Sequence, residues 1–393
     1  MEFRSVASLE ATSALNDPFR PLERSPFMLQ HSPLYEFQKG SGALFTNLFG
    51  WEIAAIFSTL NEEYETLRHA VGLLDCSQSG VIEVRGDDRT RFLHGMLTND
   101  IKQLRPGNGC YAGFLTPQGR LIGDMRVYCL EDSLLITVEP SLRSKVPLAL
   151  GKYIIGGRPE LIDQSQHLSI LALQGRQPFR LLKELSPGIR PFDQLFDHQE
   201  QNVLGTLVRI CHVDGVLDDR YDLIVPTHRL IDLWKKLVEM EGGVRLSPVG
   251  FSALNIRRVE AGIPWYEFDM DEKTLPLEAG LEKNAISLTK GCYIGQESVA
   301  RITYRGQVQR KLAGLIIAGE IVAAKGDRVF KEKQEMGWVT SNVFSIALNC
   351  PIALGYLRRE ALELGTVLRI EHSGADLQAT VSSLPFISKE TVS

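Results

Sequence analysis

The spacing of apolar residues in the first part of the chain predicts strands and helices in alternation. Residues 81–85 alternate between apolar and polar side chains, as a strand with one buried face does. Asp87 or Asp88 can then cap a helix whose apolar residues recur at helical spacing. A helix-compatible segment precedes this strand at 61–70, and strand-like runs follow at 125–130 and 134–138.

A second block of the chain repeats this mixture of strands and helices. Residues 228–241 place apolar side chains at helical spacing, and Thr227 could cap that helix. Strand-like runs occur at 168–173, 206–210 and 222–225. Hairpins mixed with helices favour an α+β fold whose strands run both ways over a doubly wound parallel sheet.

The pattern changes again near residue 309. Short β-prone runs at 312–317, 338–343, 352–357 and 367–370 alternate with Gly and polar turns, which is typical of a small β-barrel or sandwich. The first 33 residues are rich in Ser, Pro and charge and predict a flexible arm. We therefore divide the chain into an arm at 1–33, α+β subdomains at 34–160 and 161–308, and a C-terminal β-barrel domain at 309–393.

Length and charge exclude several classes of protein. A chain of 393 residues is too long for one ordinary core, and a net charge of −5 gives no general attraction to nucleic acid or to anionic membranes. No apolar run approaches the roughly 20 residues that a membrane-spanning helix needs. Because the N-terminus has no basic and apolar signal pattern, we expect a cytoplasmic protein, or an organellar one if the source is a eukaryote.

The six cysteines are scattered and form no CxxC pair. This argues against a disulfide framework, a structural zinc site or a resident iron–sulfur cluster, so we expect no metal centre. The chain also lacks a phosphate-binding GxxxxGK[ST] loop, GxGxxG, HExxH and GxSxG. A nucleotide-driven or zinc-dependent enzyme is therefore not indicated.

One cysteine lies in an unusual setting. Gly291 and Gly295 allow the backbone to turn tightly around Cys292, and Lys290 could favour its thiolate. A free cysteine is otherwise most often a small buried apolar residue. The residues that would support a reactive thiol are Gly291, Tyr293, Gly295, Gln296, Glu297 and Arg301.

Two further groups of polar residues are candidates for ligand binding. Arg258 and Glu260 could hold a ligand that carries both carboxylates and ring N–H donors, or they could form ordinary ion pairs at a helix end. The other group is Asn99, Asp100, Tyr111 and Asp124. Asn99 and Asp100 could equally end a helix, and Asp124 could be a turn residue.

Several segments together resemble the superfamily that contains the glycine-cleavage T protein and the YgfZ proteins. The blocks are Val71-Gly-Leu-Leu-Asp-Cys-Ser77, Leu97-Thr-Asn-Asp100, Arg258-Val-Glu-Ala-Gly262 and Gly337-Trp-Val-Thr-Ser341. The segment that starts at Lys290 reads KGCYIGQE and matches KGCYxGQE, the hallmark of the YgfZ branch. The resemblance implies an α+β, T-protein/YgfZ-like multidomain fold with a small C-terminal β-barrel.

The resemblance also implies a function. It predicts a tetrahydrofolate-binding protein that supports the assembly or repair of iron–sulfur enzymes, with iron–sulfur client or assembly proteins as partners. Cys292 and Lys290 take the places of the motif cysteine and lysine, and Asp218 takes that of a pterin-binding glutamate. The folate-contacting residues that it implies are Asn99, Asp100, Tyr111, Asp124, Asp218, Arg258 and Glu260.

Two alternatives remain open at this point. The first is a folate-dependent aminomethyltransferase of the T-protein type. T proteins carry paired aspartates where this chain has Gly123-Asp124, so we expect incomplete proton handling in that reaction. The second is a non-catalytic RNA-associated factor, which the acidic overall balance disfavours; the residues that suggest it are Arg301, Arg305, Arg310 and Lys311.

Overall fold

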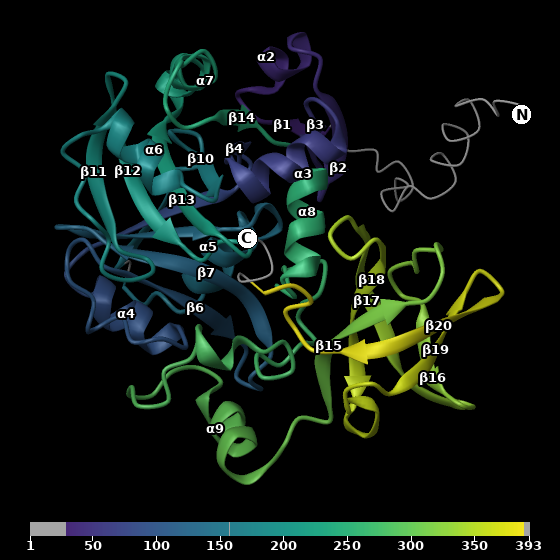
Figure 1. Cartoon of the computed structure of the whole chain (residues 1–393). Coiled ribbons are helices and arrows are strands. Elements are labelled where there is room, and N and C mark those ends of the chain that lie inside the picture. Colours follow the sequence, from purple (N-terminus) through teal and green to yellow (C-terminus); the bar gives the residue numbers. More distant parts are fainter. Residues whose placement is uncertain (1–28, 157, 389–393) are drawn as a thin grey trace, which may run out of the picture.

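The computed structural model describes residues 29–156 and 158–388, and it contains two antiparallel-rich sheets with their helices and a separate barrel (Figure 1). The predicted α+β fold with a C-terminal barrel is confirmed. Most of the predicted arm, residues 1–28, lies outside the described residues. Among those described, no helix has the length and apolar character that crossing a membrane requires.

The first sheet contains the predicted strands of the early segment. Its order is β6(Gly109–Leu115)-β7(Leu121–Cys129)-β8(Ser133–Val138)-β5(Gly80–Arg85)-β9(Glu160–Asp163), and all its pairings are antiparallel. Helices α4(Arg89–Met96) and α5(Lys145–Gly151) pack their apolar residues against one face. Asp88 is the N-cap residue of α4 as predicted, but its side chain makes no capping hydrogen bond.

The second sheet has the order β11(His198–Val203)-β12(Thr206–Val213)-β13(Asp219–Pro226)-β10(Leu168–Gly175)-β4(Val71–Asp75)-β14(Leu246–Pro248). Helices α6(Pro178–Leu185) and α7(Leu230–Val238) cover one face, where Leu182 and Trp234 join its core. The predicted capping role of Thr227 is wrong. Thr227 opens a single 3₁₀ turn before α7, and its hydroxyl bonds to that of Ser169 at 3.0 Å.

The two sheets do not follow the predicted division at 160/161. Strand β4, from the first segment, pairs with β10 in the second sheet, and β9 pairs back with β5 in the first. Hydrophobic periodicity identifies a strand but not its sheet, because pairing is set by contacts between distant segments. The first half of the chain therefore contributes β4 to the second sheet, and the predicted boundary falls inside β9, which belongs to the first sheet.

A small third sheet precedes β4. Its order is β1(Gln30–His31)-β3(Trp51–Ile56)-β2(Leu44–Leu48), so the last residues of the predicted arm are paired with β3. Helices α2(Tyr35–Gly40) and α3(Leu60–His69) follow β1 and β3. Helix α3 packs against α8(Phe251–Glu260), which runs toward the barrel (Figure 1).

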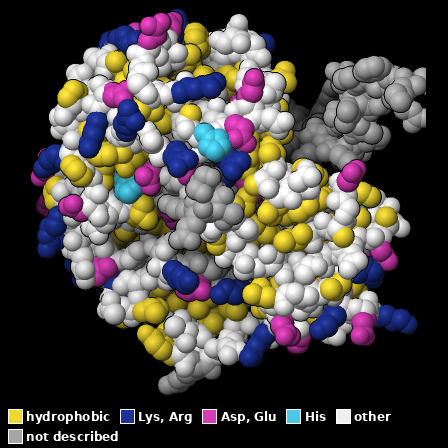
Figure 2. Space-filling model, viewed as in Figure 1, with side chains coloured by type: hydrophobic (Ala, Val, Ile, Leu, Met, Phe, Trp, Pro, Cys, Tyr) yellow, Lys and Arg dark blue, Asp and Glu magenta, His cyan; other side chains and the backbone are white. Residues whose placement is uncertain are grey.

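The barrel closes in the order β15(Arg310–Ile317)-β18(Cys350–Arg358)-β17(Gln334–Ser345)-β16(Arg328–Lys331)-β19(Val367–His372)-β20(Ala375–Ser382). All four predicted runs lie inside its strands. Helix α9(Gln296–Arg305) connects the barrel to the two-sheet body at the lower edge of Figure 1. On the face shown in Figure 2, basic and acidic side chains are intermingled.

The two large sheets pack face to face. Val81, Tyr128 and Leu135 from the first sheet meet Ile170 and Ile224 from the second in one apolar cluster. Farther along the same faces, charged side chains replace apolar ones. The interface therefore changes from a packed core into a polar cavity.

Candidate functional site

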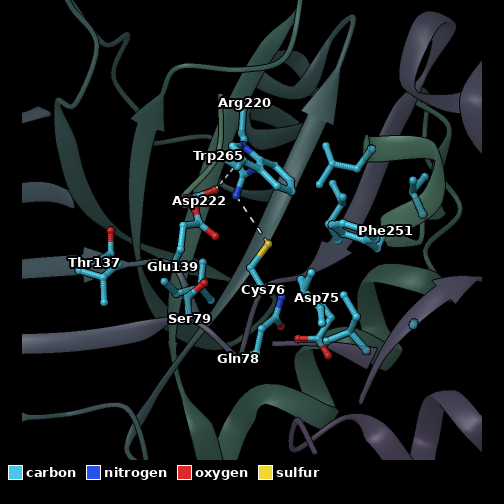
Figure 3. A pocket seen from close by; sticks show the side chains of 18 of the residues that line it. Asp75, Cys76, Gln78, Ser79, Thr137, Glu139, Arg220, Asp222, Phe251 and Trp265 are labelled. Carbon is cyan, nitrogen blue, oxygen red and sulfur yellow. Dashed lines mark hydrogen bonds and ion pairs between the residues drawn. The ribbon is translucent and has the colours of Figure 1, made fainter. Parts of the chain in front are cut away.

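A cavity of about 60 Å³ lies at the polar end of the interface between the sheets (Figure 3). Both sheets contribute to it, together with α8 and the segment that follows α8. Its aromatic wall includes Phe57, Phe251 and Trp265. The charged and thiol side chains that line it are Asp75, Cys76, Arg126, Glu139, Arg220 and Asp222.

Strand alternation explains why so many charged side chains meet here. Arg126 of β7 pairs with Thr137 of β8, and both line the cavity. Side chains two positions apart share a face, so Asp124 and Glu139 are on this face as well. Tyr111 pairs with Arg126 from β6, and its hydroxyl donates to Asp124 Oδ2 at 2.7 Å.

The groups contributed by the second sheet are largely paired with one another. Arg220 Nε donates to Asp222 Oδ1 at 2.7 Å, and Arg220 Nη2 lies 3.6 Å from Cys76 Sγ (Figure 3). Burial raises the pKa of Cys76 to about 12, so the thiol is neutral at neutral pH. Asp75 accepts hydrogen bonds from Ser32, Gln38 and the Ser77 amide.

The polar groups that the first sheet contributes are not fully hydrogen-bonded. Arg126 approaches Glu139 at 3.9 Å, too far for a hydrogen bond, and among the described residues the other charges that act on these two groups, those of Asp222 and Arg220, also make no hydrogen bond to them. Asp124 Oδ1 is buried without a hydrogen bond. Burial raises the pKa of both Glu139 and Asp124. The cavity thus presents the Glu139 carboxylate and the Arg126 guanidinium with unused hydrogen-bonding capacity, while the buried Asp124 carboxylate lies on the same face of β7 without lining the cavity.

Sequence reasoning named Tyr111 and Asp124, which lie next to Arg126 without lining the cavity, and missed the charged residues that line it. Arg126 lies inside the strand predicted at 125–130, and Asp222 begins the one predicted at 222–225. A charged residue at an inward position of a buried strand signals a polar site. Which positions point inward depends on how the two sheets face each other, which the sequence does not reveal.

The motif cysteine and lysine lie away from this cavity. Lys290 is 7% exposed, and its ammonium donates to the carbonyls of Leu97 and Asn99 at 2.6 and 2.9 Å and to that of His94. These carbonyls lie at and just beyond the end of α4, so Lys290 caps the helix. Burial lowers the pKa of Lys290 to about 8. Cys292 is exposed.

The other motif residues shape the turn into α9. Gly295 has φ of +83°, and a Cβ there would lie 2.6 Å from the Thr116 carbonyl oxygen. Tyr293 is buried, and its ring centroid lies 5.0 Å from the Lys290 ammonium. Gln296 and Glu297 open α9, with Glu297 and Arg301 exposed, and Gly291 is also exposed. The motif therefore docks α9 on the first sheet, and the role of Cys292 stays a prediction.

Asn99 and Asp100 hold the turn that follows α4. Asn99 Nδ2 donates to the Tyr111 carbonyl at 2.9 Å. This bond connects the turn to β6, whose Tyr111 hydroxyl in turn donates to Asp124. The Asp100 carboxylate accepts from the Lys102 amide and lies 3.2 Å from His94 Nδ1. Neither side chain lines the cavity.

Arg258, Glu260 and Asp218 lie in a buried polar junction near the barrel. Arg258 Nη1 donates to Asp269 at 2.6 Å, and Glu260 accepts from Tyr64 at 2.8 Å and from Ser345 at 2.6 Å. Asp218 pairs with the fully buried Arg257 at 2.8 Å. None of the three lines the cavity, so their contact with folate remains a prediction.

The structure also changes the meaning of Gly123. The next residue, Asp124, lies on the face of β7 that looks toward the cavity. Gly123 lies on the opposite face, where an added Cβ would be 2.9 Å from Leu142 Cδ2 and 3.3 Å from Val146 Cγ2. Both residues are fully buried in the core behind the sheet. A carboxylate at 123 would therefore point away from the cavity. The expectation that Gly123 removes a proton-handling group from the site does not hold for this chain.

Comparison with known proteins gives matches over almost the whole chain. The GCVT N-terminal domain matches residues 34–290, and the glycine cleavage T-protein C-terminal barrel domain matches residues 310–387. An aminomethyltransferase of Nostoc sp. is 31% identical over 91% of this chain and 96% of its own length. The Bacillus subtilis aminomethyltransferase is 27% identical over 92% and 100%.

A solved structure supports the same relationship. The glycine cleavage system aminomethyltransferase T from Bartonella henselae superposes with a TM-score of 0.83 at 25% identity, covering 92% of this chain and 99% of that protein. These relatives are named aminomethyltransferase, which overturns the prediction of an accessory factor for iron–sulfur enzymes. The alternative, a T-protein-type aminomethyltransferase, is better supported.

Both domains of the T protein are present in the expected order, and the barrel is closed. The chain therefore belongs to the glycine cleavage T-protein superfamily.

Proposed function

We propose that the protein is a tetrahydrofolate-dependent transferase of the aminomethyltransferase type, and that the cavity between the two sheets holds the pterin ring. Relatives of this family use tetrahydrofolate as substrate and cofactor. The observation that carries the proposal is the set of open polar groups on the first sheet. Arg126 and Glu139 have unused hydrogen-bonding capacity in a cavity that aromatic side chains also line, and Asp124 Oδ1 is unbonded on the same face of β7.

These groups fit a pterin chemically. A pterin has N–H donors along one edge, which carboxylates such as Glu139 accept, and a carbonyl oxygen, which a guanidinium such as Arg126 can bind. Phe251 and Trp265 offer apolar faces to a flat ring. When bound, tetrahydrofolate supplies the nitrogen that takes up the one-carbon unit.

The protein's own part in the reaction is to position groups and to move a proton. Tyr111 holds Asp124 through Oδ2, which leaves Oδ1 as the proton acceptor. The raised pKa of Asp124 makes it a stronger base than an exposed aspartate. The Arg220–Asp222 pair fixes the opposite wall. A lipoyl-bearing carrier protein, the partner of glycine-cleavage aminomethyltransferases, is the proposed donor.

Titration with tetrahydrofolate tests the binding step. A cavity of about 60 Å³ has room for only a few water molecules, so a ring must displace water and move the aromatic side chains. We therefore expect tryptophan fluorescence to change on binding. Glu139→Gln and Arg126→Gln should each weaken binding about tenfold or more, because each removes a charged hydrogen bond. The exposed Glu131→Gln is the matched control.

Aminomethyl transfer from the loaded lipoyl carrier protein to tetrahydrofolate tests the reaction. Asp124→Asn keeps the shape of the side chain and removes the proton acceptor, so we expect a loss in kcat of about 100-fold or more with little change in KM. Absence of turnover in the wild-type protein under conditions where it binds folate would overturn the proposed reaction.

A further inference from the structure

A second cavity, of about 310 Å³, lies between the segment 267–274 and the barrel. Phe268 lines it from that segment, and Trp338 and Tyr356 line it from β17 and β18. It is separated from the first cavity by stacked side chains. The Arg258 guanidinium lies 5.0 Å from the ring centroid of Trp265, which lines the first cavity, and 5.2 Å from that of Phe268.

The hydrogen-bond donors in this second cavity are only partly used. Tyr356 is 3% exposed, and its hydroxyl has the Thr274 hydroxyl as a polar neighbour but forms no well-aligned hydrogen bond in the described structure. Arg310 uses Nε for Glu278 at 3.1 Å and Nη2 for the Lys273 carbonyl at 3.4 Å, which leaves Nη1. Lys325 donates to the Glu267 carbonyl at 2.6 Å and keeps two further N–H groups.

The acceptors in the wall are mostly engaged. The Asp269 carboxylate accepts from Arg258, Thr340 and Ser341 at 2.6–2.7 Å. Asp271 Oδ1 accepts from the Thr274 hydroxyl and the Lys273 amide. In the described part of the chain, the lining carboxylate oxygens without a hydrogen bond are those of Glu267 and Asp271 Oδ2. A ligand that meets the unused donors of Arg310, Tyr356 and Lys325 must bring acceptors of its own.

We propose that the cavity between segment 267–274 and the barrel binds a small ligand that carries carboxylates. The Arg310 guanidinium and the Tyr356 hydroxyl would hold one carboxylate inside, and Lys325 would meet another at the mouth, where its side chain is exposed. The Arg310 guanidinium lies 4.8 Å from the Trp338 ring centroid and 5.4 Å from that of Tyr356, so the two rings hold it in place. The parts of the same rings that line the cavity offer apolar contact to the carbon chain of the ligand. A dicarboxylate or an oligoglutamate chain has this chemistry.

Isothermal titration calorimetry of the full chain tests the site with ligands that contain no pterin. The probes are glutarate, a γ-linked triglutamate and inorganic phosphate. Tyr356→Phe removes only the hydroxyl and should weaken glutarate binding about fivefold. Lys325→Gln removes one charge at the mouth of the cavity and should weaken binding about tenfold, and its urea midpoint checks that the fold is kept. The exposed Lys333→Gln is the control and should bind like the wild type.

The outcomes separate the possible sources of the carboxylates. Tighter binding of triglutamate than of glutarate identifies a glutamyl chain as the ligand, and equal binding identifies a free dicarboxylate. The proposal is overturned if neither probe binds, if phosphate binds as tightly as glutarate, or if both variants bind like the control. Because the probes carry no pterin, these outcomes do not depend on folate binding in the first cavity.

Discussion

At the scale of single residues, Lys290 and Cys292 act separately despite being two positions apart. The Lys290 ammonium is buried against three backbone carbonyls at the end of α4, whereas the Cys292 thiol is exposed. We predicted from the sequence that Lys290 would favour the thiolate of Cys292, because both belong to one short motif. The direction of each side chain depends on the turn between them, so proximity in sequence did not predict contact.

The stability of the two variants should therefore differ. Lys290→Met leaves the three carbonyls without their donor, and we expect the free energy of unfolding to fall by about 2–4 kcal/mol. Cys292→Ser changes an exposed side chain and should alter it by less than about 0.5 kcal/mol. Urea unfolding monitored by circular dichroism measures both. Equal losses in the two variants would show that the motif acts as one structural unit.

At the scale of elements, the strand β7 shows how alternation assigns a residue to the site or to the core. Asp124 lies on the cavity face, and Gly123 faces Leu142 and Val146 behind the sheet. The sequence predicted the strand at 125–130. It did not predict which face of that strand looks into the cavity, because this depends on how the strand packs against the second sheet and α5.

Introducing an aspartate at position 123 tests whether this position faces the core. Gly123→Asp would bury an unpaired carboxylate against apolar side chains, and we expect a loss of about 3 kcal/mol or more in unfolding free energy. Gly123→Ala is the matched control for crowding alone and should cost about 1–3 kcal/mol. If Gly123→Asp instead increases aminomethyl transfer and leaves stability unchanged, residue 123 faces the cavity and the assignment to the core is wrong.

Strand β11 carries a buried histidine that makes stability depend on pH. His198 Nε2 lies 3.0 Å from the Cys129 carbonyl oxygen, and Nδ1 lies 2.9 Å from Arg209 Nη1. These contacts suit the neutral ring that donates from Nε2 and accepts at Nδ1. Burial, together with the Arg209 charge, lowers the pKa of His198 to about 4.

Because the unfolded chain binds a proton near pH 6.5 and the folded protein only near pH 4, stability falls as the pH drops through this window. Between pH 7 and pH 5 we expect this residue to account for a loss of about 2 kcal/mol. Urea midpoints at the two pH values measure it. His198→Gln should flatten the profile, and the exposed His228→Gln should keep it. Identical profiles for wild type and His198→Gln would assign the pH dependence to other groups.

At the scale of the whole molecule, the sequence predicted the kinds of element better than their assembly. The four β-prone runs after residue 309 became barrel strands, because each alternation is local. The placement of β4 in the second sheet and of β9 in the first was not predicted, because it depends on pairing between residues about 80–100 positions apart in sequence. Arg126 and Glu139 were missed for the same reason, since the cavity exists only where the sheets meet.

The contact between the two-sheet body and the barrel rests on a buried polar junction at Asp269. Its carboxylate accepts from Arg258 of α8, from the Trp265 amide, and from Thr340 and Ser341 of β17. Arg258 and Asp269 are 0% exposed at the side chain. The junction also forms part of the wall between the two cavities. A shift of the barrel would therefore change the shape of both cavities.

Breaking this pair should destabilise the whole protein. Asp269→Asn leaves the buried Arg258 guanidinium without its counter-charge, and we expect a loss of about 3–5 kcal/mol in the free energy of unfolding. The double variant Arg258→Met/Asp269→Asn removes the stranded charge and should be less destabilised than Asp269→Asn alone. Thermal unfolding followed by calorimetry measures these differences. Because the junction ties the barrel to the body, Asp269→Asn should also split a single transition into two. A loss below about 1 kcal/mol with one sharp transition would show that apolar contacts between α8 and the barrel suffice to hold them together.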